Sequence, residues 1–277
     1  MPDANWRTLD ADALDRAYDN RGAVADSASR LAGWRARSAV LRAERPDTLD
    51  IPYGPRPRNR IDLFEGDGGN APLLAFVHGG YWQRNAREDF GCMALGPLAL
   101  GLDVALIGYT LAPEATLSEI ADEIGAALRL LRARDEVAGR PRRRLVASGW
   151  SAGGHLAALS CQWPEVDAAL CISGIYDLAP IRRTGLNEAL RLTEDEVATL
   201  SPMRLGGRRG VPVTVAYGLC ELPELQRQSR DYAALRQASG EPGGPLPLAG
   251  HDHFSILDAM IAPDGALAQA ALALARG

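Results

Sequence analysis

Short, unbroken apolar runs recur along this chain and alternate with segments of helical periodicity. The clearest helical segment is 118–134, where Ile120 and Ile124 repeat on one face. Strands that are apolar on both faces are typical of a parallel sheet covered by helices on each side. The sequence therefore predicts an α/β fold with a mostly parallel central sheet. Its strands are expected at residues 60–64, 73–77, 104–107, 145–148, 168–172, 213–217 and 246–248.

The region before the first of these strands has a different character. Residues 1–50 are polar and helical, with helices expected at 10–20 and 27–44, until prolines from Pro46 onward end the pattern. We interpret the region as an N-terminal helical cap that an extended loop joins to the sheet.

A second region interrupts the alternation of strands and helices. Residues 182–209 are irregular and charged, and they follow a strand, where a short lid or pocket wall would be inserted. A chain of 277 residues is long enough for one large α/β domain. We therefore expect residues 1–277 to form a single domain.

Composition excludes several classes of function. The net charge is −5, and the only basic cluster, 140–144, precedes a strand, where a solvated loop is expected, so neither a nucleic-acid partner nor a basic membrane-binding surface is predicted. No apolar run is long enough to span a bilayer, and the N-terminus lacks the pattern of a signal peptide. The four cysteines are far apart, which favours reduced thiols in a cytoplasmic protein.

The segment 149–153 reads Gly-Trp-Ser-Ala-Gly and lies between a predicted strand and a predicted helix. A G-x-S-x-G sequence at such a turn is typical of a nucleophilic serine, because the tight turn exposes the hydroxyl above the sheet. Ser151 is therefore the candidate nucleophile. The alternative is an ordinary helix N-cap serine.

A second glycine-rich segment follows the strand 73–77 and reads His-Gly-Gly-Tyr-Trp. Backbone amides after an early strand, together with the amide after the nucleophile, can stabilise the oxyanion of an acyl-transfer intermediate. We assign the donors to Gly80, Tyr81 and Ala152, with Gly79 shaping the turn. His78 is expected to hold this loop.

The remaining histidines supply the candidates for a general base. His155 lies inside the helix that begins at Ser151 and is expected to be packed there. His251 and His253 both lie in the loop after the last predicted strand, where this architecture places its base. Three adjacent residues, His251 to His253, do not easily converge on one ion, so no metal site and no cofactor is predicted.

The orienting acid should follow the strand 213–217. Glu221 lies shortly past that strand, and glutamate is used as an acid in this order of triad. Glu224 is expected to begin the next helix, where its charge favours the helix dipole. Asp177 and Asp252 are lesser candidates.

From about Ile61 onward the chain resembles the α/β-hydrolase kynurenine formamidases, also called arylformamidases, which are related to small carboxylesterases. Residues 78–82 fit the H-G-G-x-W signature of that family, and residues 149–157 are similar to its nucleophile segment. Segments 173–181 and 222–229 are also similar to it. The family's base histidine stands in a D-H-F context, which matches His253 rather than His251.

The resemblance implies a catalytic triad of Ser151, His253 and Glu221, although animal members carry aspartate at the acid position. It implies hydrolysis of N-formyl-L-kynurenine to L-kynurenine and formate in tryptophan catabolism. Tyr81 and Trp82 would then pack the aryl ring of this small-molecule substrate, unless Trp82 packs under the loop instead.

Two other functions stay open at this point. One is a general carboxylesterase acting on small aryl or alkyl esters, since fold and triad do not fix the leaving group. The other is a binding protein that has lost catalysis, which the presence of every candidate catalytic group disfavours. The sequence does not settle whether the chain acts alone or as a homodimer.

Overall fold

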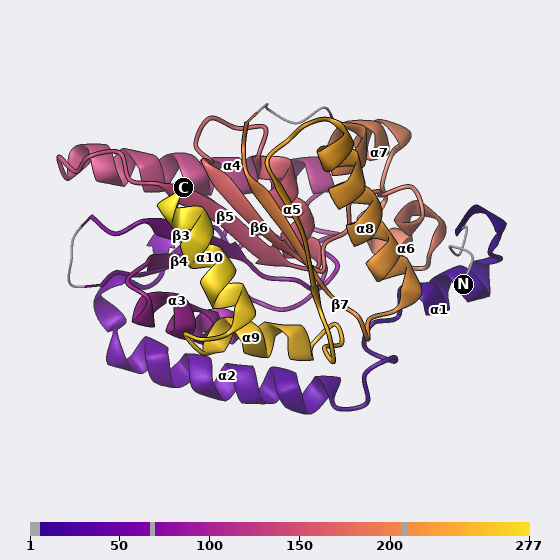
Figure 1. The fold of residues 1–277 in the computed structure, drawn as a ribbon, viewed down its shortest axis with the longest axis horizontal. Helices are drawn as coiled ribbons and strands as arrows, with labels where there is room; N and C mark the ends of the chain where they lie inside the picture. The colour runs from indigo at the N-terminus through magenta and orange to yellow at the C-terminus, as the bar shows by residue number, and fades with distance from the viewer. Residues whose placement is uncertain (1–5, 67–69, 206–209) are drawn as a thin grey trace.

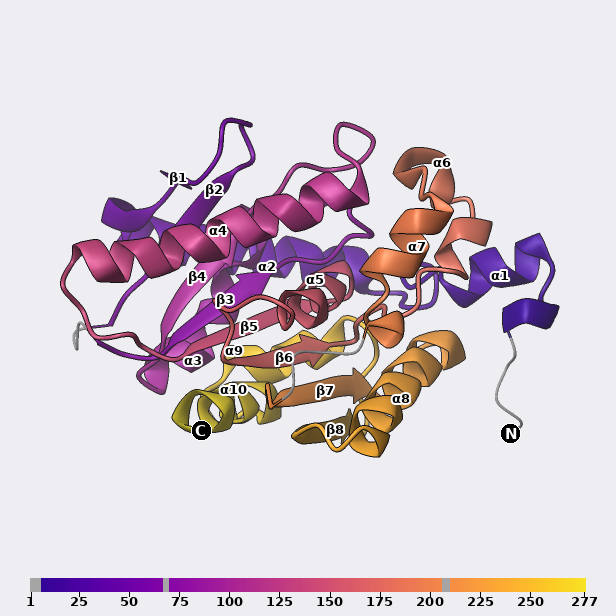
Figure 2. The ribbon, with the colours of Figure 1, turned by 90° about the horizontal axis from the view of Figure 1, so that it is seen from above.

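The computed structural model describes residues 6–66, 70–205 and 210–277. An eight-stranded sheet in the order β1-β2-β4-β3-β5-β6-β7-β8 runs through it, with helices on both sides (Figures 1 and 2). The strands are β1 (Ile51–Pro52), β2 (Arg60–Phe64), β3 (Leu73–Val77), β4 (Asp103–Ile107), β5 (Leu145–Trp150), β6 (Ala168–Ile172), β7 (Val213–Gly218) and β8 (Gly243–Leu248).

Strand direction changes only at one end of the sheet. β1 pairs antiparallel with β2, and β2 pairs antiparallel with β4, whereas all the other neighbours are parallel. β3, β4, β5 and β6 are buried along their whole lengths, since helices cover both of their faces. The predicted mostly parallel sheet is confirmed.

Each face of the sheet has its own hydrophobic core. On one face, α4 (Leu117–Val137), α5 (Ala152–Ser160) and α8 (Pro223–Ala238) pack together with α1 (Ala11–Ala17) and α7 (Glu194–Leu200). On the other face, α2 (Ser27–Glu44), α3 (Leu95–Ala99), α9 (Asp258–Ile261) and α10 (Ala266–Arg276) pack with the 3₁₀ helix Arg87–Ala94.

The predicted cap helices appear as α1 and α2, which contribute to opposite cores. The segment between them, which includes Asn20 and Arg21, reaches the cavity next to Ser151 and so crosses the carboxyl ends of the strands (Figure 2). Residues 1–5 of the expected cap lie outside the described residues. The assignment of 1–277 to a single domain stays a prediction.

The expected lid, 182–209, contains α6 (Asn187–Leu190), α7 and two 3₁₀ turns, and its residues 206–209 lie outside the described part. The side-chain amide of Gln83 donates to the backbone carbonyl of Leu186 at 2.9 Å, and this hydrogen bond connects the segment to the loop after β3. Its role as a lid stays a prediction.

Within the ranges that the structure describes, no single helix combines the length and apolar character needed to cross a membrane. The helical segments Ser255–Ile261 and Ala266–Arg276, bent by 55°, meet that criterion only when they are taken together.

Candidate active site

Ser151 occupies a strained turn between β5 and α5. Its backbone has φ 57° and ψ −118°, a conformation that residues with a side chain rarely adopt. Its amide donates to the carbonyl of Ile172 at 2.8 Å, which fixes the turn against the end of β6. A Cβ on Gly153 would lie 2.0 Å from the carbonyl oxygen of Val77, so the turn requires glycine there. The local sequence thus forces the Ser151 side chain into a defined position at the sheet end.

His253 and Glu221 form a buried pair beside this turn. His253 Nδ1 lies 3.0 Å from Glu221 Oε2, and both side chains are almost fully buried. The other carboxylate oxygen, Oε1, accepts from the hydroxyl of Ser173 and from the amide of Gly218, each at 2.6 Å. With three donors, the buried carboxylate has the partners that an ionised group requires.

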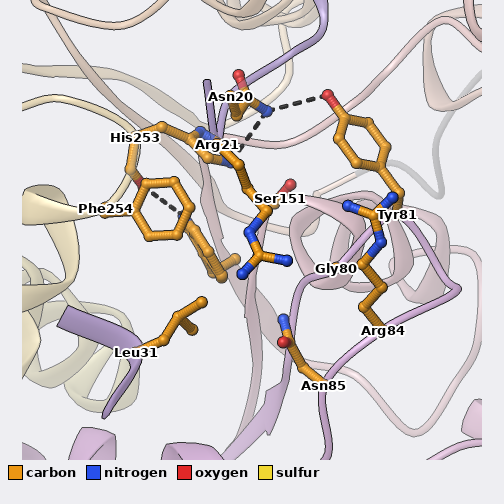
Figure 3. A pocket seen from close by; sticks show the side chains of 11 residues that line it. Asn20, Arg21, Leu31, Gly80, Tyr81, Arg84, Asn85, Ser151, His253 and Phe254 are labelled. Carbon is orange, nitrogen blue, oxygen red and sulfur yellow. Dashed lines mark hydrogen bonds between the residues drawn. The ribbon is translucent and has the colours of Figure 1, made fainter. Parts of the chain in front are cut away.

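A chain of hydrogen bonds defines the tautomer of His253. The Tyr81 hydroxyl donates to the carbonyl of Tyr18 at 2.6 Å, so it must accept from Asn20 Nδ2 at 3.0 Å. The same Nδ2 lies 3.2 Å from His253 Nε2, which therefore accepts (Figure 3). The imidazole is then protonated at Nδ1 and has its lone pair at Nε2, which is the form a general base needs.

Trp150, immediately before the nucleophile, connects the serine turn to the histidine loop. Its indole Nε1 donates to the carbonyl of His253 at 2.7 Å, and the two rings lie 5.0 Å apart. The variable position of the serine motif therefore holds the imidazole on the same side of the sheet as Ser151.

The loop after β3 leaves backbone amides without an acceptor beside the nucleophile. The carbonyl of Gly79 accepts from the His78 ring at 2.9 Å and from the Asn85 amide at 3.0 Å. Because a trans peptide is planar, the N–H of Gly80 points in the opposite direction. Among the described residues, the amides of Gly80, Tyr81 and Ala152 have no acceptor.

The same loop packs directly on the serine turn. A Cβ on Gly79 would lie 3.0 Å from Ser151 Cβ and 2.7 Å from the carbonyl oxygen of Trp150. Gly80, Tyr81 and Trp82 all have positive φ, which produces the tight turn after Gly79. The three candidate donors are thus brought to the side of Ser151.

His78 is a structural part of this loop. Its ring is stacked between Phe90 and Tyr109, with centroids 5.8 and 4.4 Å away. Burial lowers the pKa of His78 to about 4, so the neutral ring donates to Gly79.

Ser151 and His253 line one small cavity (Figure 3). Its volume is about 40 Å³, enough for a few water molecules. The lining residues are Asn20, Arg21, Leu31, Gly80, Tyr81, Arg84, Asn85, Trp150, Ser151, His253 and Phe254.

Tyr81 lines this cavity, whereas Trp82 does not. Trp82 is fully buried and packs edge-on against His155, with ring centroids 5.0 Å apart. The position of Trp82 corresponds to packing under the loop, not to contact with a ligand.

The other candidate bases and acids lie in structural contacts. His155 hydrogen-bonds the carbonyl of Leu200 at 2.8 Å, and burial lowers its pKa to about 4. His251 contacts the carbonyl of Ser255. Burial acts to raise the pKa of Asp252, but amide donors from Ser255 and Phe254 outweigh it and lower that pKa.

The remaining acids are also engaged elsewhere. Asp177 pairs with Arg204 at 3.2 Å, and Glu224 pairs with Arg227 at 2.8 Å, as well as accepting from Tyr18. Glu221 is therefore the acid that the structure brings to His253. In the described ranges no group of three or more His, Cys, Asp or Glu side chains is arranged to hold a metal ion.

Sequence analysis missed several residues of this site. Asn20, Arg21 and Leu31 come from the N-terminal cap, and no local motif marks them. Trp150 lies inside the serine motif, and Ser173 lies in a segment similar to the family, yet neither position indicates a hydrogen-bond partner by itself. Asn85 follows the oxyanion loop by only a few residues, which is the one signal that could have found it.

The chain is similar to several known proteins. A family model described as BD-FAE matches residues 61–171. Kynurenine formamidase of Danio rerio is 27% identical over 93% of this chain and 94% of its own length. The Salmo salar kynurenine formamidase is 28% identical, covering 96% and 97%.

A solved structure is also similar to this chain in its fold. The crystal structure of a protein provisionally named a thioesterase, from Silicibacter sp. TM1040, superposes with a TM-score of 0.85 and 28% identity. The match covers 92% of this chain and 97% of that one. The chain has the α/β-hydrolase fold, and its resemblance to kynurenine formamidases and related esterases is confirmed.

Proposed function

We propose that this protein is a serine hydrolase that converts N-formyl-L-kynurenine to L-kynurenine and formate, a step of tryptophan catabolism. The similarity to two kynurenine formamidases over nearly the whole chain supports this assignment. The observation that carries the mechanism is the buried 3.0 Å contact between His253 and Glu221 at the cavity that Ser151 also lines.

In the first half of the proposed reaction, Ser151 Oγ attacks the formyl carbon while His253 Nε2 takes its proton. Glu221 holds the Nδ1–H tautomer and stabilises the imidazolium that forms. The amides of Gly80, Tyr81 and Ala152 donate to the oxyanion, and each such donor is typically worth about 10²–10³ in turnover.

Collapse of the tetrahedral intermediate breaks the C–N bond. His253 returns its proton to the aryl nitrogen, and the free amine leaves as L-kynurenine. The formyl group remains on the enzyme as an ester of Ser151. Water, deprotonated by the same Nε2, then attacks the ester and releases formate. No step requires a metal ion or a cofactor.

The proposal is tested by comparing kcat/KM for N-formyl-L-kynurenine and for p-nitrophenyl acetate. We expect efficient hydrolysis of the formamide that Ser151→Ala abolishes. A formamide rate near background together with fast ester hydrolysis would instead establish the alternative, a carboxylesterase. That alternative uses the same residues and agrees with the name of the thioesterase structure.

A cytoplasmic location belongs to the same proposal. All four cysteines are free thiols, with Cys92, Cys161 and Cys171 buried and Cys220 exposed, as in a reducing compartment. The proposed partner is the small-molecule substrate alone.

A further inference from the structure

The cavity at Ser151 is far smaller than the substrate that the proposed function requires. Small-molecule sites typically measure about 300–1,000 Å³, whereas this cavity measures about 40 Å³. A second hollow of about 310 Å³ lies next to it and is lined by residues from the N-terminal cap and by Gly185 and Leu186.

Four residues line both spaces and therefore form the wall between them: Asn20, Arg21, Tyr81 and Arg84. Asn20 is buried, but its Oδ1 has no hydrogen-bond partner in the described ranges. The Asn20 amide is thus held through Nδ2 alone. For a substrate to extend from Ser151 into the outer hollow, this side chain would have to move away from His253.

The two arginines of this wall have no acidic partner. Within the described residues, neither the Arg21 nor the Arg84 guanidinium makes a hydrogen bond or an ion pair, whereas other exposed arginines such as Arg35 pair with a carboxylate. Figure 3 shows the Arg21 guanidinium extending over the cavity and that of Arg84 lying along the Tyr81 side chain.

The acidic groups of the outer hollow, Asp15 and Asp19, form no ion pair with these guanidiniums and accept from backbone amides instead. Asp15 accepts from the amide of Gly185 at 2.8 Å, and Asp19 accepts from the amide of Gly22 at 2.9 Å. Arg16 is a further cation on the same hollow. The hollow therefore carries three guanidiniums and two carboxylates, and within the described ranges the guanidiniums of Arg21 and Arg84 remain available to an incoming carboxylate.

We propose that Arg21 and Arg84 form a carboxylate-binding subsite that recognises the acidic end of the substrate while its acyl group lies at Ser151. The inference rests on the proposed function and extends it, since it assigns the residues that recognise the amino-acid end of the substrate. Guanidinium groups suit this role because their N–H donors match a carboxylate in pairs. The substrate class is a small aryl acyl compound with a carboxylate remote from the bond that is cleaved.

Calorimetric titration tests this subsite without any turnover. L-Kynurenine carries the carboxylate, and 2-aminoacetophenone is the same aryl ketone without the amino-acid end. Both are titrated into the wild-type protein and into the variants Arg21→Gln and Arg84→Gln. Arg37→Gln serves as the control, because Arg37 is an exposed arginine of α2 that does not line either space.

We expect each of Arg21→Gln and Arg84→Gln to weaken L-kynurenine binding about tenfold, as for the loss of a charged hydrogen bond. The Kd of 2-aminoacetophenone should stay within about twofold in every protein, and Arg37→Gln should bind both compounds like the wild type. Unchanged unfolding midpoints of the variants exclude a folding defect.

The inference is overturned if L-kynurenine does not bind the wild type, if both arginine variants keep its Kd, or if they weaken both compounds equally. Because no bond is cleaved, the outcome is separate from the kinetic test of the proposed function. Selective loss of L-kynurenine binding in a protein that does not cleave the formamide would support the subsite and contradict the formamidase assignment.

Discussion

Asn20 Nδ2 lies 3.2 Å from His253 Nε2, although the two residues are 233 positions apart in the chain. This nitrogen of the imidazole must accept the proton of Ser151 in the proposed reaction. Because neutral imidazole offers one lone pair there, Asn20 and Ser151 compete for it. In this structure Asn20 occupies the Nε2 position, so the proposed reaction requires this contact to break before Nε2 can accept the proton of Ser151.

Removing this competitor should make the serine more reactive. In Asn20→Ala, the rate constant for inactivation by a small fluorophosphonate is expected to rise about fivefold, since one hydrogen bond of about 1 kcal/mol no longer holds Nε2. Labelling reactions quenched at a series of times and analysed by intact-protein mass spectrometry give this rate constant. A decrease of tenfold or more would mean that Asn20 positions the imidazole for catalysis and does not block it.

Glu221 should increase the rate of hydrolysis in two ways, through its negative charge and by holding His253 in the Nδ1–H tautomer. Glu221→Gln keeps the size of the side chain but replaces the anion, and we expect kcat to fall by about 10⁴ with a much smaller change in KM. Asp252→Asn is the matched control, since the Asp252 carboxylate accepts from the backbone amides of Phe254 and Ser255, whereas His253 Nδ1 lies against Glu221. A larger loss in Asp252→Asn than in Glu221→Gln would show that the acid has been assigned wrongly.

Asn85 should act through the peptide between Gly79 and Gly80. Its φ of 71° suits glycine, so Asn85→Gly removes the donor to the Gly79 carbonyl without adding strain. The Gly79 carbonyl then keeps only its hydrogen bond from the His78 ring, so the Gly80 amide is held less firmly, and kcat for formamide hydrolysis is expected to fall about tenfold at nearly constant KM. Steady-state kinetics decide this, because a raised KM at constant kcat would place Asn85 in substrate binding instead.

Two buried neutral histidines should make the fold sensitive to acid. The pKa values of His78 and His155 are lowered from 6.5 to about 4, so the unfolded chain binds more protons between those pH values. Their stabilising effect is complete above about pH 6.5 and is lost as the pH falls toward 4. Each contributes up to about 1.4 kcal/mol per pH unit in that window.

Urea unfolding at pH 7.5 and 5.0 measures this effect. His155→Gln keeps a donor for the Leu200 carbonyl but does not titrate, so it should lose about 2 kcal/mol less on acidification than the wild type. An identical loss in both proteins would mean that His155 does not stay neutral in the folded state.

Much of the fold and the core of the site follow from local sequence. The predicted strands 60–64, 73–77 and 168–172 coincide with β2, β3 and β6. For β3 and β6 the reason is that a short, unbroken apolar run between helices is typical of a strand buried on both faces. The turn at Ser151 and the loop after β3 could also be predicted from nearby sequence, since the spacing of their glycines specifies both turns.

The differences arise where distant contacts decide the structure. β8 begins at Gly243, three residues before the predicted strand, because β7 holds the turn-like Gly243 and Gly244 in parallel register. Residues 89–100, whose apolar spacing alone would favour one continuous helix, form a 3₁₀ helix followed by the short α3. There the amide of Cys92 donates to the Ser38 hydroxyl of α2 at 2.9 Å.

The cover of the site could not be predicted for the same reason. Asn20 and Arg21 reach Ser151 because the neighbouring Tyr18 is held by two residues of the distant helix α8. Its hydroxyl donates to Glu224 at 3.1 Å and accepts from Gln228 at 2.9 Å. No periodicity or motif records such a contact. Trp82, in contrast, belongs to a motif, yet only packing determines that its side chain turns toward His155.

The most direct test of the account is to map where a fluorophosphonate reacts with the protein. Peptide mass spectrometry should find one adduct, on Ser151. The adduct should be absent in Ser151→Ala and should form at least 100-fold more slowly in His253→Ala, as expected when a nucleophile loses its general base. An adduct on another residue, or undiminished labelling in His253→Ala, would contradict the proposal that these two side chains act together.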